Sequence, residues 1–142
     1  MRNSLAAAVL SLTLTNATLY AGDAPSTRTP EQIVRHHISA MLRHDARELA
    51  EDYADDAVMV LSANVVSGRQ QIQRFFESAA QRRQPADDNA TFKVARIESE
   101  AVIEEWSHKA ADGSTVNGAD VIVVRYGKIV FHCSLPAAAP AK

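Results

Sequence analysis

The amino-acid sequence predicts an α+β fold in which helices come first and strands follow. Three helix starts, each with capping residues and apolar side chains at helical spacing, lie before residue 90, and the apolar period changes to two after it. This order favours a curved, mostly antiparallel sheet with the helices packed on one face. A chain of 142 residues has the length of a single domain with its own core.

The helix starts carry recognisable caps. Thr29, Pro30 and Gln32 suit an N-cap, the first helical position and a capping box. Asp45 and Glu48 repeat the box for a short second helix. The expected helices cover about residues 29–43, 45–54 and 67–80, and the apolar residues 57–61 are expected to form a buried strand.

The second half of the chain is typical of four strands joined by tight turns. Asp112-Gly113 and the corner from Tyr126 to Lys128 suit hairpin turns. Residues 121–124 are apolar on both faces, which predicts a central strand. The expected strands cover about residues 91–98, 101–109, 115–126 and 129–135.

The first 21 residues have the order of a secretory signal. Arg2 precedes an apolar stretch, and Ala21 supplies a small residue for cleavage. We therefore expect cleavage after Ala21 and an exported protein, periplasmic or secreted. Residues 22–28 would then form a linker, and the Ala/Pro-rich residues 136–142 a flexible tail.

Composition excludes several classes of function. A formal net charge of −2 provides no electrostatic attraction to nucleic acid or, once the signal is removed, to an acidic membrane. The single cysteine excludes an internal disulfide and a cysteine-based zinc cluster. The five histidines have no recognised ligand spacing, and no glycine-rich phosphate loop is present. We expect neither a metal nor a cofactor.

Three segments carry a family resemblance: DARELAEDYADDAV at residues 45–58, SGRQQI at 67–72 followed by Phe75-Phe76, and VVRYGKIV at 123–130. Together they resemble the nuclear transport factor 2-like superfamily, in its SnoaL-like and ketosteroid-isomerase-like branch. The resemblance implies a SnoaL-like domain over residues 29–135, with a cone-shaped fold that encloses a pocket. It also implies a homodimer paired through the outer sheet face.

The same resemblance does not carry over the chemistry of a ketosteroid isomerase. That mechanism uses a carboxylate base, a tyrosine and a protonated aspartic acid. Their places fall here on Leu61, on His37 and on Val123, or on Ile122 if the register slips by one. Steroid isomerisation by that route is therefore not expected. The residues expected to line a pocket for a small apolar molecule are Tyr53, Leu61, Phe76, Trp106 and Val123.

Two histidines are the candidate catalytic residues. His37 lies on the apolar stripe of the first helix, between Ile33 and Met41, and is either a core histidine or a ligand-facing acid/base. For His132 the two arguments disagree. The family resemblance places a polar residue here in the pocket, whereas simple alternation places it opposite the apolar side of its strand. The acids Glu104, Glu105 and Asp120 are expected to be solvated or capped in the main, although one of the adjacent glutamates must point inward or toward a partner.

Three functions stay open from the sequence. The first is a pocket protein that binds a small apolar molecule without catalysis. The second is a histidine-centred isomerase, cyclase or lyase acting on a small hydrophobic substrate. The third is a dimeric accessory domain. The relative position of His37 and His132 discriminates the first two: convergence within a substrate's width favours the enzyme, and an entirely apolar pocket floor favours the binder.

Overall fold

The computed structural model describes residues 27–62, 64–82 and 89–137. The expected signal peptide, the linker up to residue 26 and the tail from residue 138 lie outside the described residues. The helices and strands in the described part follow one another as α1 (Pro30–Leu42), α2 (Ala46–Glu51), β1 (Tyr53–Leu61), β2 (Asn64–Ser67), α3 (Arg69–Gln81), β3 (Thr91–Glu98), β4 (Ala101–Lys109), β5 (Thr115–Arg125) and β6 (Lys128–Pro136).

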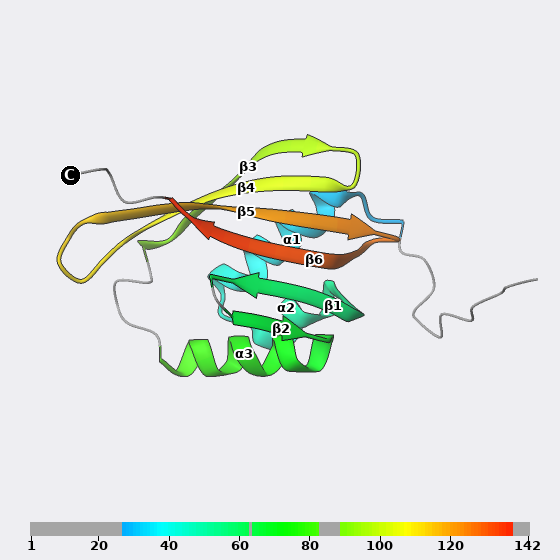
Figure 1. Cartoon of the computed structure of the whole chain (residues 1–142), viewed down its shortest axis with the longest axis horizontal. Helices are drawn as coiled ribbons and strands as arrows, with labels where there is room; N and C mark the ends of the chain where they lie inside the picture. The colour runs from blue at the N-terminus through cyan, green and yellow to red at the C-terminus, as the bar shows by residue number, and fades with distance from the viewer. Residues whose placement is uncertain (1–26, 63, 83–88, 138–142) are drawn as a thin grey trace, which may run out of the picture.

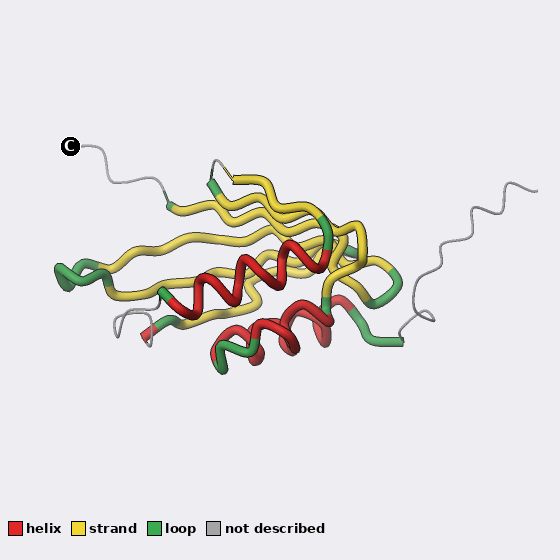
Figure 2. The backbone as a smooth tube through the Cα atoms, turned by 90° about the horizontal axis from the view of Figure 1, so that it is seen from below, coloured by secondary structure: helices red, strands yellow, loops and turns green. Residues whose placement is uncertain are grey.

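The strands form one curved sheet in the order β2-β1-β6-β5-β4-β3 (Figure 1). Every neighbouring pair is antiparallel except β1 and β6, which run parallel. The helices lie on one side of the sheet, as Figure 2 shows. The predicted α+β fold, with helices packed on a curved, mostly antiparallel sheet, is confirmed.

Helix α1 begins as its sequence predicts. The Thr29 hydroxyl accepts a hydrogen bond from the backbone N–H of Gln32, and the Gln32 side chain accepts one from the backbone N–H of Thr29. Pro30 occupies the first helical position. The buried face of the helix carries Ile33, Val34, His37 and Ala40, so a histidine enters the core among apolar side chains.

The segment after α2 differs from the sequence prediction. The predicted helix ran to about residue 54, but α2 ends at Glu51 and the chain enters β1 at Tyr53. Two long-range contacts explain the early end: the carbonyl of Asp52 accepts a 2.7 Å hydrogen bond from the backbone N–H of Ile129, and Tyr53 pairs with Ile129 in the sheet. Strand β2 was not predicted, because its four largely exposed residues carry no apolar alternation.

A β-bulge in β6 decides which side chains face the helices. Val124 pairs with Ile129, but Val123 pairs with Phe131, so Val130 is an extra residue. The bulge shifts the alternation by one, and both Ile129 and His132 become buried. Simple alternation from Ile129 therefore places His132 on the wrong face. The preceding turn has positive φ at both central residues, Tyr126 (50°) and Gly127 (71°), as a type I′ hairpin requires.

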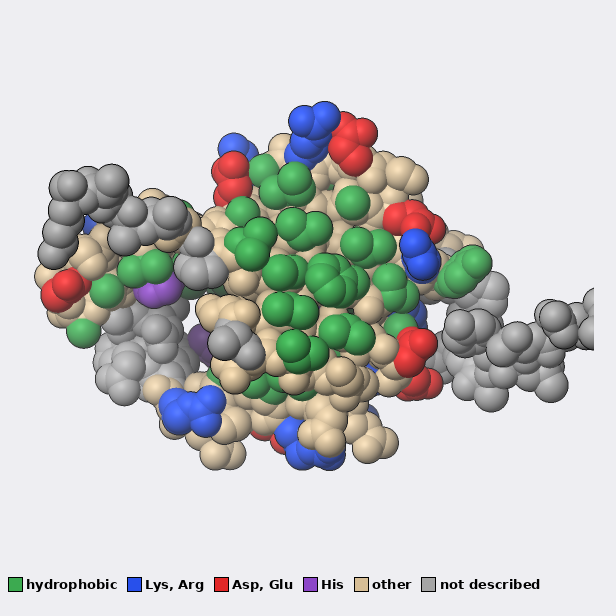
Figure 3. Space-filling view, viewed as in Figure 1, with side chains coloured by type: hydrophobic (Ala, Val, Ile, Leu, Met, Phe, Trp, Pro, Cys, Tyr) green, Lys and Arg blue, Asp and Glu red, His purple; other side chains and the backbone are tan. Residues whose placement is uncertain are grey.

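The two faces of the sheet differ in their neighbours. The inner face packs against the helices and contains the buried core residues Met59, Val102, Ile122 and Val124. The outer face carries half-buried Val121, Val123 and Phe131. Beside them lie Ile103 and Leu135, which are 36% and 52% exposed. Figure 3 shows apolar side chains gathered over the middle of this face.

Candidate functional site

Four strands and one helix bring polar side chains together inside the molecule. His37 comes from α1, Tyr53 from β1, Glu104 from β4, Asp120 from β5 and His132 from β6. Each of the five is at most 4% exposed. Buried polar groups are costly unless they are hydrogen-bonded, so their partners decide what this cluster can do.

Tyr53, His132 and Asp120 form a continuous hydrogen-bonded chain. The Tyr53 hydroxyl lies 2.6 Å from Nδ1 of His132, and Nε2 of His132 lies 3.0 Å from Oδ2 of Asp120. A carboxylate can only accept, so in the neutral ring Nε2 carries the hydrogen and Nδ1 accepts from the Tyr53 hydroxyl. The order hydroxyl, imidazole, carboxylate is that of a catalytic triad, with a phenol in place of the usual serine.

Asp120 is held in its ionised form by donors on several sides. Burial alone would raise the pKa of this carboxyl, but hydrogen bonds from His132, Ser134 and Trp106 and the charge of His132 outweigh it, so the pKa lies below its usual value. The indole Nε1 of Trp106 donates to Oδ1 at 2.7 Å. Trp106 can lie close to β5 because residue 118 is glycine: a Cβ there would stand 2.1 Å from the indole ring.

The Tyr53 hydroxyl keeps its proton. Burial raises its pKa well above the usual value, and the carboxyl groups of Asp120, Glu104 and Asp52 add to the rise. Tyr53 therefore acts as a neutral donor to His132 and not as a resting phenolate.

His37 closes the cluster from the helix side. Its ring meets those of Tyr53 and His132 edge-on, with centroids 5.5 Å away in both cases. Burial, and then the nearby His132, lower its pKa to about 3, so the ring is neutral at pH 7. Neither ring nitrogen has a hydrogen-bond partner among the residues that the structure describes. One unpartnered donor and one unpartnered acceptor thus stand in the core beside the triad.

Glu104 is the second buried group without a partner. It lies opposite Asp120 on the neighbouring strand, and no side chain or backbone group in the described part of the chain is hydrogen-bonded to either of its carboxyl oxygens. Burial, together with the charge of Asp120, raises its pKa to about 8. At pH 7 Glu104 is therefore mostly a neutral carboxylic acid, which can donate a hydrogen bond as well as accept one.

A small pocket between the helices adjoins the cluster. Its volume is about 210 Å³, and it is lined mainly by apolar residues of the three helices, among them Met41, Leu49 and Phe76. The Phe76 ring also meets the His37 ring edge-on at 6.4 Å. Phe76 therefore stands between this pocket and the buried polar cluster.

The structure brings together most of the residues that the sequence singled out. His37, His132 and Tyr53 are in mutual contact, and Phe76 contacts His37. Leu61 packs against the core, opposite Ser134 on β6. Trp106 reaches the cluster through its hydrogen bond to Asp120. Val123 does not join them, because it lies on the outer face between Ala101 and Phe131.

Sequence reasoning anticipated the buried acids only in part. One of the adjacent glutamates was expected to point inward or toward a partner, and Glu104 is the one that is buried. Asp120 was expected to be solvated or capped, and it is also buried on the inner face. A usable signal was present, since each acid lies two residues from a core residue on the same strand face, Val102 and Ile122. Within the described ranges no group of His, Cys, Asp and Glu could hold a metal ion, and no helix is long and apolar enough to cross a membrane.

The fold and the enclosed polar cluster define a small α+β protein of the NTF2-like class. An NTF2-like protein of unknown function from Mesorhizobium loti superposes with a TM-score of 0.62 at 22% identity, over 77% of this chain and 91% of that one. A protein from Sphaerobacter thermophilus superposes at 0.65 with 16% identity, over 77% and 96% of the two chains. A Kribbella flavida protein described as a proposed ketosteroid isomerase gives 0.63 and 16%, over 80% and 81%.

The family of the protein follows from the match between its sequence and a protein-family model. The SnoaL-like domain model matches residues 34–132, which span most of the chain, and the protein belongs to this family. No curated protein matches the sequence. The structural likenesses are all at low identity and establish the fold, so the chemistry has to be argued from the site itself.

Proposed function

We propose that the protein binds a small, mainly apolar carbonyl compound between its helices and its sheet and moves a proton on it, as an isomerase or lyase without a cofactor. The observation that carries this proposal is the convergence of His37, Tyr53 and His132, with ring centroids 5.5 to 6.2 Å apart and a hydrogen-bonded acid behind them.

The triad supplies a route for the proton. The Tyr53 oxygen takes a proton from the carbon next to the substrate carbonyl as its own proton passes to Nδ1 of His132. The imidazolium that results is stabilised by Asp120, as in other hydroxyl–imidazole–carboxylate sites. The same proton then returns to another carbon in an isomerase, or to a leaving group in a lyase.

The two unpartnered groups complete the site. Neutral Glu104 donates to the substrate oxygen, on which negative charge develops when the carbon loses its proton. Neutral His37 provides a further donor and acceptor that orient the substrate. The proposed substrate enters past Phe76, from the pocket of about 210 Å³ between the helices, whose mainly apolar lining suits a small hydrophobic molecule.

The test is exchange of carbon-bound hydrogen for deuterium. The full chain is incubated in D₂O with a panel of small cyclic and aryl ketones, and loss of the α-proton signals is followed by NMR. We expect exchange above the rate in buffer for at least one ketone, and a fall of about 10²-fold or more in Tyr53→Phe. The matched control is Tyr126→Phe, because Tyr126 is 83% exposed. Equal exchange in the two variants would contradict the triad's role.

A second candidate is binding without catalysis. It is favoured by the mainly apolar lining of the helix pocket and by Leu61, which stands where a ketosteroid isomerase would have its base. Ketones that perturb the spectrum of the protein without exchanging their α-protons would select this function over the enzyme.

We further propose that the protein acts after export to the periplasm or the outside. The support is the order of charge, apolar stretch and small residue over residues 1–21. Mass spectrometry of the protein recovered from its native host should give a chain beginning at Gly22, and retention of Met1 would contradict export.

A further inference from the structure

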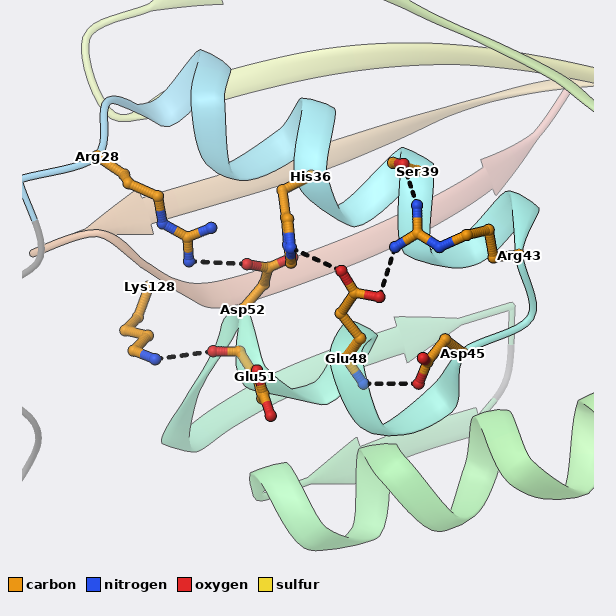
Figure 4. Close-up of polar contacts among 9 residues, drawn as sticks. All are labelled: Arg28, His36, Ser39, Arg43, Asp45, Glu48, Glu51, Asp52 and Lys128. Carbon is orange, nitrogen blue, oxygen red and sulfur yellow. Dashed lines mark hydrogen bonds and ion pairs between the residues drawn. The ribbon is translucent and has the colours of Figure 1, made fainter.

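A second polar network lies directly beside the buried cluster, at the surface where α1, α2 and β1 meet (Figure 4). Its centre is His36, whose Nδ1 lies 2.7 Å from Oδ2 of Asp52 and whose Nε2 lies 3.0 Å from Oε1 of Glu48. Asp52 is fully buried and also accepts a 2.9 Å hydrogen bond from Arg28. Glu48 is further paired with Arg43.

Both ring nitrogens of His36 therefore face carboxyl groups. A carboxylate only accepts, so both contacts are hydrogen bonds at the same time only when each ring nitrogen carries a hydrogen. A neutral ring keeps one N–H and turns a lone pair toward the other carboxylate, which breaks one of the two contacts. The bridge from α1 to α2 and β1 is complete in the protonated state of His36 and incomplete in the neutral state.

Two residues of this bridge are adjacent in sequence to residues of the buried cluster. His36 precedes His37 on α1, and Asp52 precedes Tyr53 at the start of β1. His36 and Asp52 are joined by a 2.7 Å contact between Nδ1 and Oδ2, whereas the rings of His37 and Tyr53 meet edge-on with centroids 5.5 Å apart. Within the described residues the His37 side chain has no hydrogen-bond partner, so no polar contact there fixes its ring against Tyr53.

We propose that His36 is a positioning residue: by bridging Asp52 and Glu48 it fixes α1 against the start of β1 and so holds His37 against Tyr53. The proposed function supplies only the reason why His37 should be held against Tyr53. The bridge of His36 with Asp52 and Glu48 is present without a substrate. It makes the arrangement of the inner rings depend on the protonation of an outer, half-exposed histidine.

The surroundings of His36 bear on this dependence. Asp52 faces it from the start of β1 and Glu48 from α2, and each has a cationic partner, Arg28 and Arg43. On its own helix, Arg35 pairs with Glu31. Lys128, the first residue of β6, donates to the carbonyl of Glu51. Burial raises the pKa of Asp52, and His36 and Arg28 oppose this rise. The two acids that face His36 are thus each shared with a fixed cation, Asp52 with Arg28 and Glu48 with Arg43.

The test uses side-chain NMR on the full chain labelled with ¹⁵N-histidine and, to follow the Tyr53 ring, with ¹³C-tyrosine. Between pH 5 and 8 we expect the His37 ring signals of the wild type to move in step with those of His36. In His36→Gln this pH-dependent movement should be lost, because a glutamine amide cannot contact both carboxyl groups at once as the two ring nitrogens of His36 do. The His37 and Tyr53 signals should then lie, at pH 5, near their wild-type positions at pH 8.

Two further variants keep the proposal testable if His36→Gln does not fold. Glu48→Gln removes one end of the bridge at a side chain that is 32% exposed, and it should reduce the movement of the His37 signals. Arg43→Gln is its control, because it removes the Arg43 pair with Glu48 and leaves His36 in place. His37 and Tyr53 signals that stay at their wild-type positions in folded His36→Gln or Glu48→Gln would overturn the proposal.

This outcome is separate from the fate of the proposed function. If no ketone exchanges its protons but the His37 signals follow His36, positioning stands and the reaction fails. If exchange occurs and the signals do not follow, the reaction stands and positioning fails.

Discussion

Glu104 and Asp120 lie directly opposite each other on β4 and β5, and both carboxyl groups are buried on the inner face of the sheet. Of the two, only Asp120 has hydrogen-bond donors within the described ranges. Two neighbouring buried carboxyl groups cannot both ionise at low cost, so one proton is retained and it resides on Glu104. Because their surroundings differ, Asp120 is a charged hydrogen-bond acceptor and Glu104 is a neutral donor.

Replacing Glu104 by Gln should remove a pH dependence of stability. The folded pKa of about 8 exceeds the ordinary 4.5, so the stability that the protonated group contributes is complete below pH 4.5 and is lost as the pH rises to about 8. We expect Glu104→Gln to raise Tm at pH 8 by about 5 °C or more relative to the wild type, with little difference at pH 4.5. Thermal unfolding followed by circular dichroism measures this. Glu105→Gln is the matched control, since Glu105 is exposed. A Tm difference between Glu104→Gln and the wild type that is the same at all pH values would contradict the raised pKa of Glu104.

His37 should make the stability of the fold depend on pH in the opposite direction, with a loss of stability in acid. Its folded pKa of about 3 lies below the ordinary 6.5, so its contribution to stability is complete above pH 6.5 and is lost as the pH falls toward 3. In His37→Leu this acid loss should be reduced, while turnover or affinity falls about tenfold or more through loss of a hydrogen bond. Denaturant titrations between pH 4 and 7 check the stability. His44→Asn, at an exposed position whose positive φ asparagine tolerates, should keep the wild-type dependence of stability on pH. Unchanged binding per folded molecule would make His37 purely structural.

Gly118→Ala should disturb the site from outside. An added Cβ would lie 2.1 Å from the Trp106 ring, so the indole must move away from β5 and its bond to Asp120 is weakened. We expect a fall in Tm and a displaced indole N–H signal in the proton NMR spectrum. Asn117→Ala, at the exposed position just before it on the strand, should leave that signal in place. A wild-type indole signal in Gly118→Ala would contradict the described packing.

The outer sheet face is expected to pair with a second copy of the chain. Val121, Phe131 and Leu135 contribute to an apolar surface on this face, and contiguous apolar surface of this kind favours association. Sedimentation at micromolar concentration should give a dimer, and Val121→Lys should shift it toward monomer. Tyr126→Lys, in the exposed turn before β6, should not. A wild-type monomer at high micromolar concentration would contradict pairing.

Much of the fold could be predicted because local signals agree with the tertiary structure. The Thr29 capping box begins α1 as expected, and the predicted spans of β3 and β4 match the observed ones. Prediction failed where partners distant in sequence decide the structure. Tyr53 enters a strand because it pairs with Ile129, although its segment resembles the end of a helix. The inward orientation of His132 depends on the bulge at Val130, which no local pattern indicates.

The site was predictable only in part for the same reason. His37 was found because helical spacing alone places it on the apolar stripe of α1. Pairing of Tyr53 with His132 and Asp120 requires three strands in their correct order, which the sequence does not state. The depth of Glu104 and Asp120 depends on how far α1 covers the sheet, and the neighbouring Glu105, on the other face, is exposed.

Trp106 is the only tryptophan of the chain, and its indole N–H donates to the buried Asp120. The protein therefore carries its own optical reporter, placed one hydrogen bond from the triad. Indole emission depends on the charge and polarity around the ring, so a compound that alters the hydrogen bonding of Asp120 should change the fluorescence without any added label. Chemical libraries can be screened on the unmodified protein, before its substrate is known, by following this single signal.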